Sequence, residues 1–175
     1  ADQVFQSIAS KKLKVNSKKP LSFEQMILLI DSAEGDLKKL LMIGATTGLR
    51  LGDCVTLRWS EVDLNKGLIT RVPNKTSKSN GTPSLIGIPV DLINELSLTP
   101  ISQRKKYIFE EWAAEYNYVS ASGSHTRRDR VGKIIKKHFE SNGIECTREG
   151  KKRSITEYGF HSLRHAYVVQ QASRG

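Results

Sequence analysis

The final stretch of the sequence, HSLRHAYVVQQASRG, places two imidazoles and one guanidinium within five positions. If this segment is helical, His161, Arg164 and His165 occupy positions i, i+3 and i+4 and share one face. The apolar side chains among them would point elsewhere and could be buried. The spacing therefore predicts a helix with a polar, chemically capable face on one side.

Two other short stretches carry residues of similar chemistry. In ATTGLRLGD, Gly48 is the expected C-cap of a buried helix, Arg50 stands just beyond it, and Asp53 follows three residues later. An arginine at such a junction is held by backbone geometry rather than by a solvated helix face. In NKTSKSNGT, Lys75 and Lys78 lie near the tip of a predicted hairpin.

Arginine, lysine and histidine together form a poor metal site but a good phosphate site. A guanidinium matches two nonbridging phosphate oxygens at once, and its interaction strengthens as charge builds up in the transition state. Lysine and histidine can supply and remove protons. Each feature alone has an ordinary explanation as a solvated or structural residue, whereas the combination and order of all three indicate phosphate chemistry.

Local signals predict the helices that would position these groups. Ser22 with Gln25 forms a capping box that starts a first helix, and Asp36 caps a second one. A short helix is expected over residues 91–98, and Thr126 caps a longer helix. The last helix contains the HSLRH stretch.

The remaining pattern completes the expected fold class. Residues 68–72 and 85–88 are rich in β-branched side chains, and Asn80-Gly81 between them is a hairpin signal. Residues 143–159 read as a polar, basic loop. In the helix after Thr126, the apolar period predicts a buried side made of Val131, Ile134, Ile135, His138 and Phe139. The sequence therefore predicts a mainly α fold with a small antiparallel β-sheet, an α+β domain.

Charge and composition narrow the classes of partner. The 175 residues include 28 Lys and Arg against 18 Asp and Glu, a net charge of +10 that favours a polyanionic partner. The isolated Cys54 and Cys146 have no metal spacing and suit a reducing cytoplasm. The basic residues expected to bind DNA, in addition to Lys78, are Arg127, Arg128, Arg130, Lys133, Lys137, Lys151, Lys152 and Arg153.

Taken together, TTGLRLGD, NKTSK and HSLRH resemble the catalytic domain of the tyrosine recombinases, the phage integrase family of DNA recombinases. The resemblance runs from about Pro20 to Gly175. It implies that Arg50 and Arg164 are the arginine pair, Lys75 the hairpin lysine and His161 the histidine of the H-x-x-R motif. It also implies supporting positions for Asp53, as the acidic residue, and for His165, as a less directly engaged histidine. Type IB topoisomerases share this chemistry, but the compact spacing is closer to an integrase.

The resemblance also implies the reaction and the partners. A tyrosine hydroxyl attacks a DNA phosphate to give a 3′-phosphotyrosine, and a second strand later reverses the step, with no metal or nucleotide cofactor. The expected partners are double-stranded DNA and other recombinase protomers in a synaptic tetramer, and the expected location is the cytoplasm, with the nucleoid.

The family's nucleophile follows the H-x-x-R helix by a few tens of residues, and none of the tyrosines present stands there. Residues 1–19 are expected to be a linker or the remnant of an upstream core-binding domain, and residues 20–175 a catalytic domain that lacks its nucleophile. The five tyrosines are Tyr107, Tyr116, Tyr118, Tyr158 and Tyr167.

Two alternatives remain open from the sequence. The chain could be a DNA-binding regulator that kept the phosphate site and lost catalysis. It could also be a metal-dependent nuclease, for which Glu61 and Asp63 are the best carboxylates, although no third ligand is evident.

Overall fold

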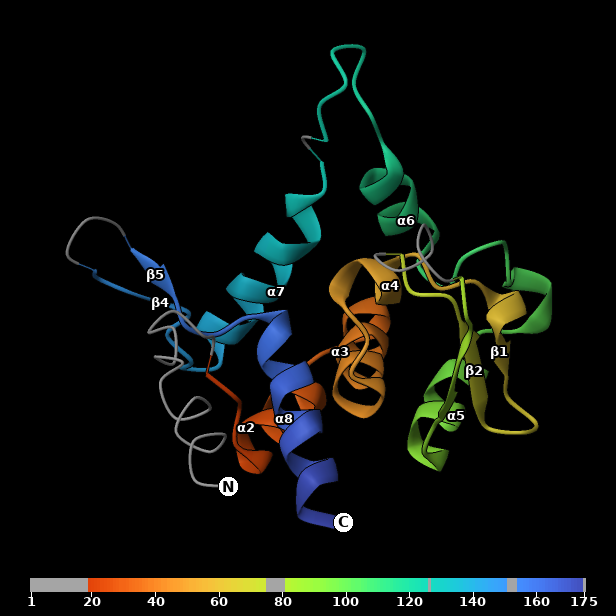
Figure 1. The fold of residues 1–175 in the computed structure, drawn as a ribbon, viewed down its shortest axis with the longest axis horizontal. Helices are drawn as coiled ribbons and strands as arrows, with labels where there is room; N and C mark the ends of the chain where they lie inside the picture. The colour runs from red at the N-terminus through yellow and green to blue at the C-terminus, as the bar shows by residue number, and fades with distance from the viewer. Residues whose placement is uncertain (1–18, 75–80, 126, 151–153, 175) are drawn as a thin grey trace, which may run out of the picture.

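The structure, a computed structural model, describes residues 19–74, 81–125, 127–150 and 154–174, with side chains to residue 169. These residues form a mainly helical domain with two small antiparallel sheets, which confirms the predicted fold class (Figure 1). None of the described helices is both long and apolar enough to span a bilayer.

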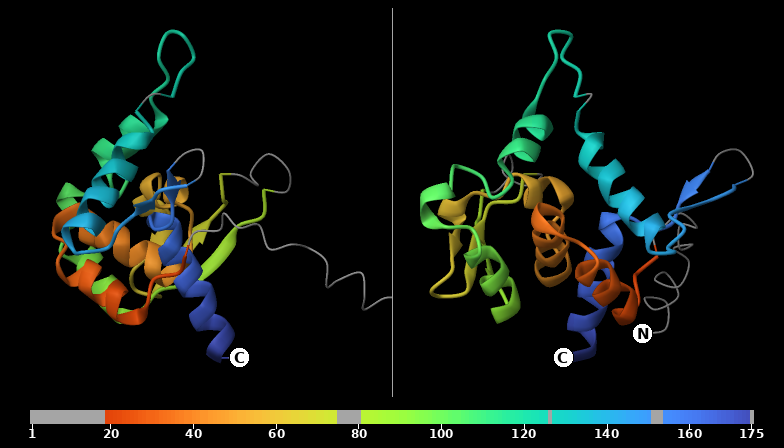
Figure 2. Two further views of the ribbon diagram at one scale, coloured as in Figure 1. Left: turned by 90° about the vertical axis from the view of Figure 1, so that its left-hand side faces the viewer. Right: turned by 180° about the vertical axis from the view of Figure 1, so that it is seen from behind.

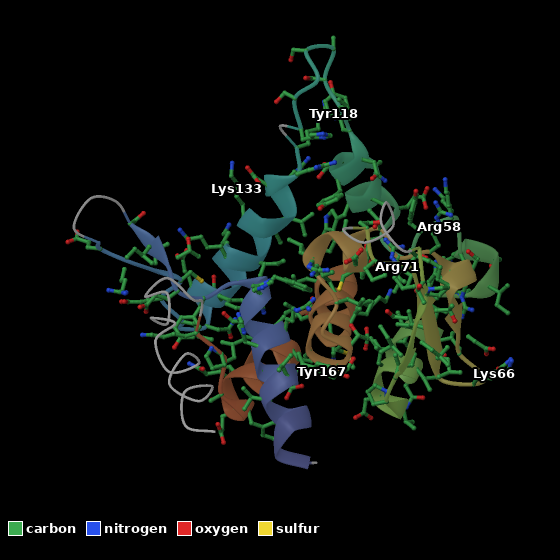
Figure 3. The ribbon with its side chains drawn as sticks, in the orientation of Figure 1. Arg58, Lys66, Arg71, Tyr118, Lys133 and Tyr167 are labelled. Carbon is green, nitrogen blue, oxygen red and sulfur yellow. The ribbon has the colours of Figure 1, made fainter. Side chains whose placement is uncertain are left out.

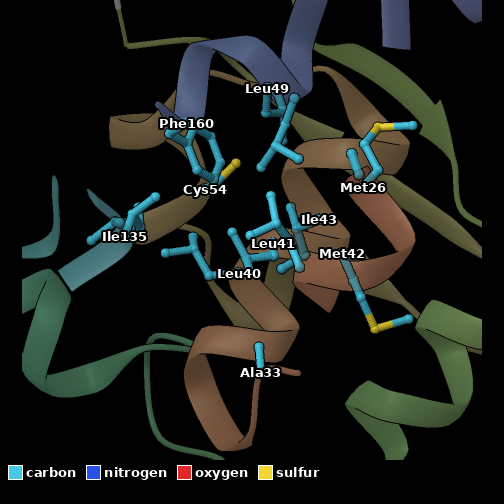
Figure 4. Close-up of a cluster of buried hydrophobic side chains, with 14 of the residues drawn as sticks. Met26, Ala33, Leu40, Leu41, Met42, Ile43, Leu49, Cys54, Ile135 and Phe160 are labelled. Carbon is cyan, nitrogen blue, oxygen red and sulfur yellow. The ribbon is translucent and has the colours of Figure 1, made fainter. Parts of the chain in front are cut away.

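A central helix, α3 (Gly35–Thr47), organises the core. Helices α2 (Phe23–Asp31) and α8 (Phe160–Arg174) pack against it, and its middle is buried on every side. Leu40, Leu41 and Ile43 project from α3 toward neighbouring elements that supply Ile135 and Phe160 (Figure 4). A helix buried all round is a rigid base from which its two ends can position other groups.

The ends of these helices test the capping predictions. Ser22 and Gln25 form the predicted capping box, with each side chain bonded to the other's backbone N–H. Gly48 is the predicted C-cap of α3, with φ +63° and its N–H bonded to the Gly44 carbonyl. The predicted Asp36 cap is wrong. The N-cap is Glu34, so Asp36 lies inside the first turn, where a carboxylate still favours the positive end of the helix.

The larger sheet has the order β1 (Val62–Asp63), β2 (Leu68–Arg71), β3 (Ser84–Gly87), all antiparallel. Strands β2 and β3 lie within one residue of the two predicted strands. Ile69 pairs with Ile86, and Arg71 pairs with Ser84. The predicted turn residue Asn80 lies outside the described residues. Helix α5 (Val90–Ser97) follows one residue earlier than predicted.

Helices α6 (Glu110–Asn117) and α7 (Asp129–Ser141) run to and from a loop that projects from the body (Figures 1 and 2). The predicted inner side of α7 is confirmed: Val131, Ile135 and Phe139 are buried, and Ile134 and His138 are half-buried. Its start is not where predicted, because α7 begins at Asp129 with Arg128 as the N-cap. Thr126 lies outside the described residues and precedes that cap.

Several short elements were not predicted. Helix α4 (Leu51–Val55) follows α3 directly, and one-turn 3₁₀ helices span Trp59–Glu61 and Ile101–Gln103. The predicted loop over 143–159 contains a hairpin of β4 (Thr147–Arg148) and β5 (Ile155–Thr156). Elements this short do not repeat often enough to show a period in the sequence.

Candidate functional site

The turn between α3 and α4 fixes the backbone of Arg50. Gly48 adopts the left-handed conformation, and the Thr47 hydroxyl both donates to the Ile43 carbonyl (2.6 Å) and accepts from the Leu49 N–H (3.2 Å). Leu49 is then buried, and Arg50 becomes the N-cap of α4. The half-exposed Arg50 side chain therefore leaves the domain from a well-determined point.

Helix α8 docks on α3 over two glycines. A Cβ built on Gly44 would lie 2.5 Å from Cζ of Phe160, and one on Gly48 would lie 2.6 Å from Cδ1 of Tyr167. Tyr167 thus packs between α8 and the end of α3, as the sequence predicted for a core-facing residue (Figure 3). Contacts this close require glycine on α3, and they fix the position of α8 relative to Arg50.

Arg164 lies on the side of α8 near α4. Burial raises the pKa of the Cys54 thiol far above its usual range, and the Asp53 carboxylate raises it further. The positive charges of Arg71 and Arg164 act on the same thiol in the opposite direction. Helix α8, which carries Arg164, packs on α3 through Phe160 and Tyr167, and Tyr167 contacts Gly48, two residues before Arg50.

Arg50 and Arg164 share one electrostatic feature. Among the described residues, neither guanidinium forms a hydrogen bond or an ion pair, and both side chains are half-exposed. Two uncompensated cations beside the same short helix favour an anion between them. A phosphate, which accepts bidentate hydrogen bonds from guanidinium groups, has suitable chemistry for this position.

The two histidines of the motif lie in the first turns of α8. The rings of His161 and His165 meet edge to face, with centroids 5.2 Å apart. His161 is exposed and His165 is half-buried against the domain. This difference agrees with an outer histidine that can reach a ligand and an inner one that supports it.

Asp53 holds the start of the β2–β3 loop. Its carboxylate is 2% exposed, and its Oδ1 accepts a hydrogen bond from the Asn74 backbone N–H (2.8 Å). Asp53 lies in α4, three residues after Arg50, so one short helix contacts both the arginine site and the loop that carries Lys75. This position suits the supporting role predicted for Asp53.

Arg71, which contacts Asp53 and the start of the β2–β3 loop, is a residue that the sequence did not single out. It lies at the end of β2 (Figure 3) and is 5% exposed. Its Nη1 donates to both carboxylate oxygens of Glu61, with N···O distances of 3.1 and 2.8 Å. It also lies 3.7 Å from Oδ1 of Asp53. The alternation of side chains along β2 could have indicated its inward orientation, because Arg71 stands two residues after the buried Ile69.

Glu61 and Asp63, the carboxylates of the nuclease alternative, have structural contacts. Glu61 binds Arg71 and accepts from the Arg58 backbone N–H (2.8 Å). Asp63 accepts from the Lys66 N–H in the β1–β2 turn (3.0 Å), and this hydrogen bond lowers the pKa of its carboxyl group. Both side chains serve local structure, and the structure gives this alternative no support.

The predicted DNA-binding residues on α7 and in the loop that precedes it form an exposed basic surface. Lys133 and Lys137 make no ion pair with any described residue. Arg130 instead pairs with Glu115 of α6. Arg127 stacks on Tyr118, 4.0 Å from the ring centroid, and Arg128 stacks on Tyr116 at 5.1 Å.

Some predicted site residues cannot be placed. Lys75 and Lys78 of the β2–β3 loop, and Lys151, Lys152 and Arg153 of the β4–β5 loop, lie outside the described residues. Arg50 and Asp53 lie on α4, and Asp53 contacts the start of the β2–β3 loop. Arg164 and the two histidines lie on α8, whose Tyr167 packs against Gly48, two residues before Arg50.

The fold and this arrangement of basic residues define a class of protein. The XerA recombinase superposes on 94% of the chain with a TM-score of 0.61 at 19% identity, covering 53% of that protein. A lambda integrase dimer bound to a COC′ core site matches 97% of the chain with a TM-score of 0.60 at 16% identity, covering 45% of that protein. The domain has the fold of a tyrosine recombinase catalytic domain.

Sequence comparison reaches the same class. The Phage integrase family matches residues 19–174, and the chain belongs to this family of tyrosine recombinases. It is 30% identical to the Escherichia coli (strain K12) protein named as defective, IntQ, across the whole chain and 48% of that protein. It is 28% identical to the integrase of Salmonella phage P22 over 80% of the chain and 33% of that protein. The chain thus spans half or less of these relatives.

Proposed function

We propose that this chain is the catalytic domain of a site-specific DNA recombinase in which Arg50 and Arg164 hold the scissile phosphate. One observation carries the proposal. Two arginines from distant parts of the sequence lie on α4 and α8, helices that meet at the C-cap of α3, and neither has a hydrogen-bond or ion-pair partner among the described residues. Such a pair gains most when a phosphate between them acquires charge in the transition state.

Each predicted residue has a role in the reaction. A tyrosine oxygen forms a bond to phosphorus as the bond from phosphorus to the 5′-oxygen breaks, which leaves a 3′-phosphotyrosine. Lys75 donates the proton that the departing 5′-oxygen needs, and His161 assists proton transfer at the phosphate. Asp53 positions the loop that carries Lys75, and His165 supports His161. The guanidinium forks stabilise the equatorial oxygens.

The partner we propose is duplex DNA, bound by other protomers as well in the complete assembly. Lys133 and Lys137 of α7 are exposed and form no ion pair with a described residue, which supports a nonspecific contact with phosphates. The matched structure of lambda integrase is described as a dimer bound to a DNA core site. These features support a location on chromosomal or mobile-element DNA.

The nucleophile is proposed to be a tyrosine outside these 175 residues. Tyr167 packs on Gly48, Tyr158 packs against the core, and the Tyr116 hydroxyl lies over Gly52. These side chains have structural contacts, whereas an attacking hydroxyl must stand about 3–3.5 Å from the phosphorus, in line with the leaving group.

A second candidate function is a DNA-binding regulator without catalysis. The observation that favours it is the name of the E. coli relative IntQ, which describes that protein as defective. Both candidates require DNA binding, and they differ only in whether a covalent adduct forms.

A nicked duplex that traps the covalent intermediate separates the two candidates. The complete gene product, incubated with a nicked duplex of its own recombination site, should give a denaturant-resistant protein–DNA band. The 175 residues alone should bind the duplex and give no such band. A complete protein that binds its site and never forms an adduct would support the regulator instead. An adduct on the 175 residues alone would contradict the proposed origin of the nucleophile, and peptide mapping would then identify the tyrosine.

A further inference from the structure

A polar cluster surrounds the buried Arg71 between α4, β2 and the 3₁₀ turn that contains Glu61, with Asn74 at its exposed edge. Arg71 Nη1 donates to the Thr56 carbonyl (3.0 Å) and to both Glu61 carboxylate oxygens. Its Nη2 donates to the Thr56 hydroxyl (2.7 Å) and to Oδ1 of Asn74 (3.1 Å). One side chain thus joins the end of α4 to the end of β2.

Asn74 is the point on which the cluster converges. Its backbone N–H donates to Oδ1 of Asp53, its Oδ1 accepts from Arg71, and its Nδ2 donates to the Thr56 hydroxyl (3.2 Å). Contacts to Asp53, Arg71 and Thr56 thus involve both the backbone and the side-chain amide of this residue. Asn74 is bonded directly to Lys75 and is the last described residue before that lysine.

We propose that Arg71 and Asn74 are positioning residues that couple the lysine loop to the helix capped by Arg50. The inference rests on the proposed function, because it concerns where Lys75 is held relative to the phosphate bound by Arg50 and Arg164. Neither residue contacts the phosphate. They act through Lys75 by fixing the base of its loop.

The cluster is poorly suited to serve stability alone. Arg71 is buried with one donor, Nε, that has no hydrogen-bond partner among the described residues. Buried ion pairs contribute little net stability compared with apolar packing, and an orphaned donor reduces the contribution further. Because the network contributes little net stability, we attribute its role to the single geometry that it imposes on Asn74.

The test compares two DNA substrates in the complete gene product. One has the normal bridging 5′-oxygen at the cleaved phosphate, and the other has sulfur there, which leaves without a proton. Asn74→Ala removes the contacts to Arg71 and Thr56, and it should slow cleavage of the oxygen substrate about 10-fold or more. Cleavage of the sulfur substrate should return to within about 3-fold of the wild-type rate, because a misplaced general acid no longer matters.

Ser84→Ala is the matched control, because Ser84 lies opposite Arg71 in β3, is exposed and takes no part in the cluster. It should cleave both substrates like the wild type. Arg50→Ala should stay impaired on both substrates, because it removes charge stabilisation and not a proton donor. A milder change at the centre of the cluster, Arg71→Lys, should behave like Asn74→Ala, because lysine keeps the charge and cannot bridge Thr56, Glu61 and Asn74 at once.

The outcomes separate this inference from the function on which it rests. If Asn74→Ala cleaves the oxygen substrate normally, or is equally slow on both substrates, the positioning role is wrong while the recombinase function stands. If the wild type forms no adduct with either substrate, the proposed function is wrong, and the positioning role that depends on it is wrong as well. Amide exchange gives an independent reading: the Asn74 N–H should exchange faster in Arg71→Lys, and unchanged exchange would contradict the coupling.

Discussion

The arginines of this domain occupy two contrasting environments. Arg71 is buried, sits between the carboxylates of Glu61 and Asp53, and donates five hydrogen bonds to Thr56, Glu61 and Asn74. Arg50 and Arg164 are half-exposed and form no ion pair or hydrogen bond with a described residue. The positive charge of Arg71 is balanced by nearby carboxylates, whereas the charges of Arg50 and Arg164 are not balanced by any described residue.

This difference indicates which arginines have a structural role and which are available to bind an external anion. A cation whose charge is balanced inside the protein has nothing left to offer a phosphate, so Arg71 can only hold other residues in place. A cation that the fold leaves unbalanced, on a backbone fixed by a helix cap, is preorganised for an external anion. Arg50 is the N-cap of α4, and Arg71 contacts Asp53 within α4 and Thr56 at its C-terminal end.

The largest expected effect on stability comes from removing the buried arginine. Arg71→Met should lower the free energy of unfolding by about 3–5 kcal/mol, because it leaves the Asp53 and Glu61 carboxylates without their cation. Arg50→Met should change the same quantity by less than about 0.5 kcal/mol, since the Arg50 guanidinium forms no hydrogen bond or ion pair with a described residue. Urea denaturation followed by circular dichroism and by fluorescence measures both. Equal losses of unfolding free energy in the two variants would contradict the distinction between a structural Arg71 and an Arg50 without a structural role.

An intermediate effect is expected where α8 meets α3. Gly48→Ala places a Cβ 2.6 Å from the Tyr167 ring and also strains a residue with φ +63°, so it should shift α8 and with it Arg164. Gly143→Ala is the matched control, because its φ of +77° gives similar backbone strain while nothing lies within 4 Å of the added Cβ. Each should lose about 1–2 kcal/mol from the backbone.

Gly48→Ala should lose a further 1–3 kcal/mol, roughly, from the steric contact with Tyr167. Cleavage by the complete gene product should fall in Gly48→Ala and not in Gly143→Ala, since only the former moves one catalytic arginine relative to the other. If the two variants are alike in stability and in cleavage, the glycine contact does not set the geometry of the site.

The smallest effects are expected on the basic surface of α7. Lys133→Ala and Lys137→Ala should each reduce the slope of log K against log salt for duplex binding by about 0.9, the contribution of one phosphate contact. Arg130→Ala should reduce it less, because Arg130 is already paired with Glu115. Titrations at several ionic strengths measure the slopes. A larger effect from Arg130 than from the lysines would mean that internal pairing does not separate the two kinds of residue.

The sequence predicted the parts of this structure that depend on local patterns. The capping box at Ser22, the C-cap at Gly48 and the inner face of α7 all follow from residues a few positions apart, and the HSLRH helix starts within one residue of its expected place. Helix α4 has five residues, and β4 and β5 have two each, which is too short for a period to be visible.

The cluster around Arg71 depends on contacts that no local pattern contains. Its partners Asp53, Thr56 and Glu61 precede it by 10 to 18 residues and belong to other elements. Alternation along β2 could have predicted that Arg71 faces inward, but it could not identify the carboxylates that compensate its charge. The position of Arg164 beside α4 was likewise available only through the packing of α8 on α3.

The central claim is that Arg50 and Arg164 act on charge that develops at one phosphate, and one paired measurement tests it most directly. For Arg50→Ala, Arg164→Ala and the corresponding lysine variants, the rate of covalent adduct formation and the Kd for the recombination site are measured with the same complete protein. We predict that the alanine variants form the adduct about 10²–10³-fold more slowly, as when a transition-state donor is lost, while the Kd changes far less. The lysine variants should recover little activity, because a point charge does not span two oxygens. Loss of binding and cleavage in equal proportion would contradict the claim.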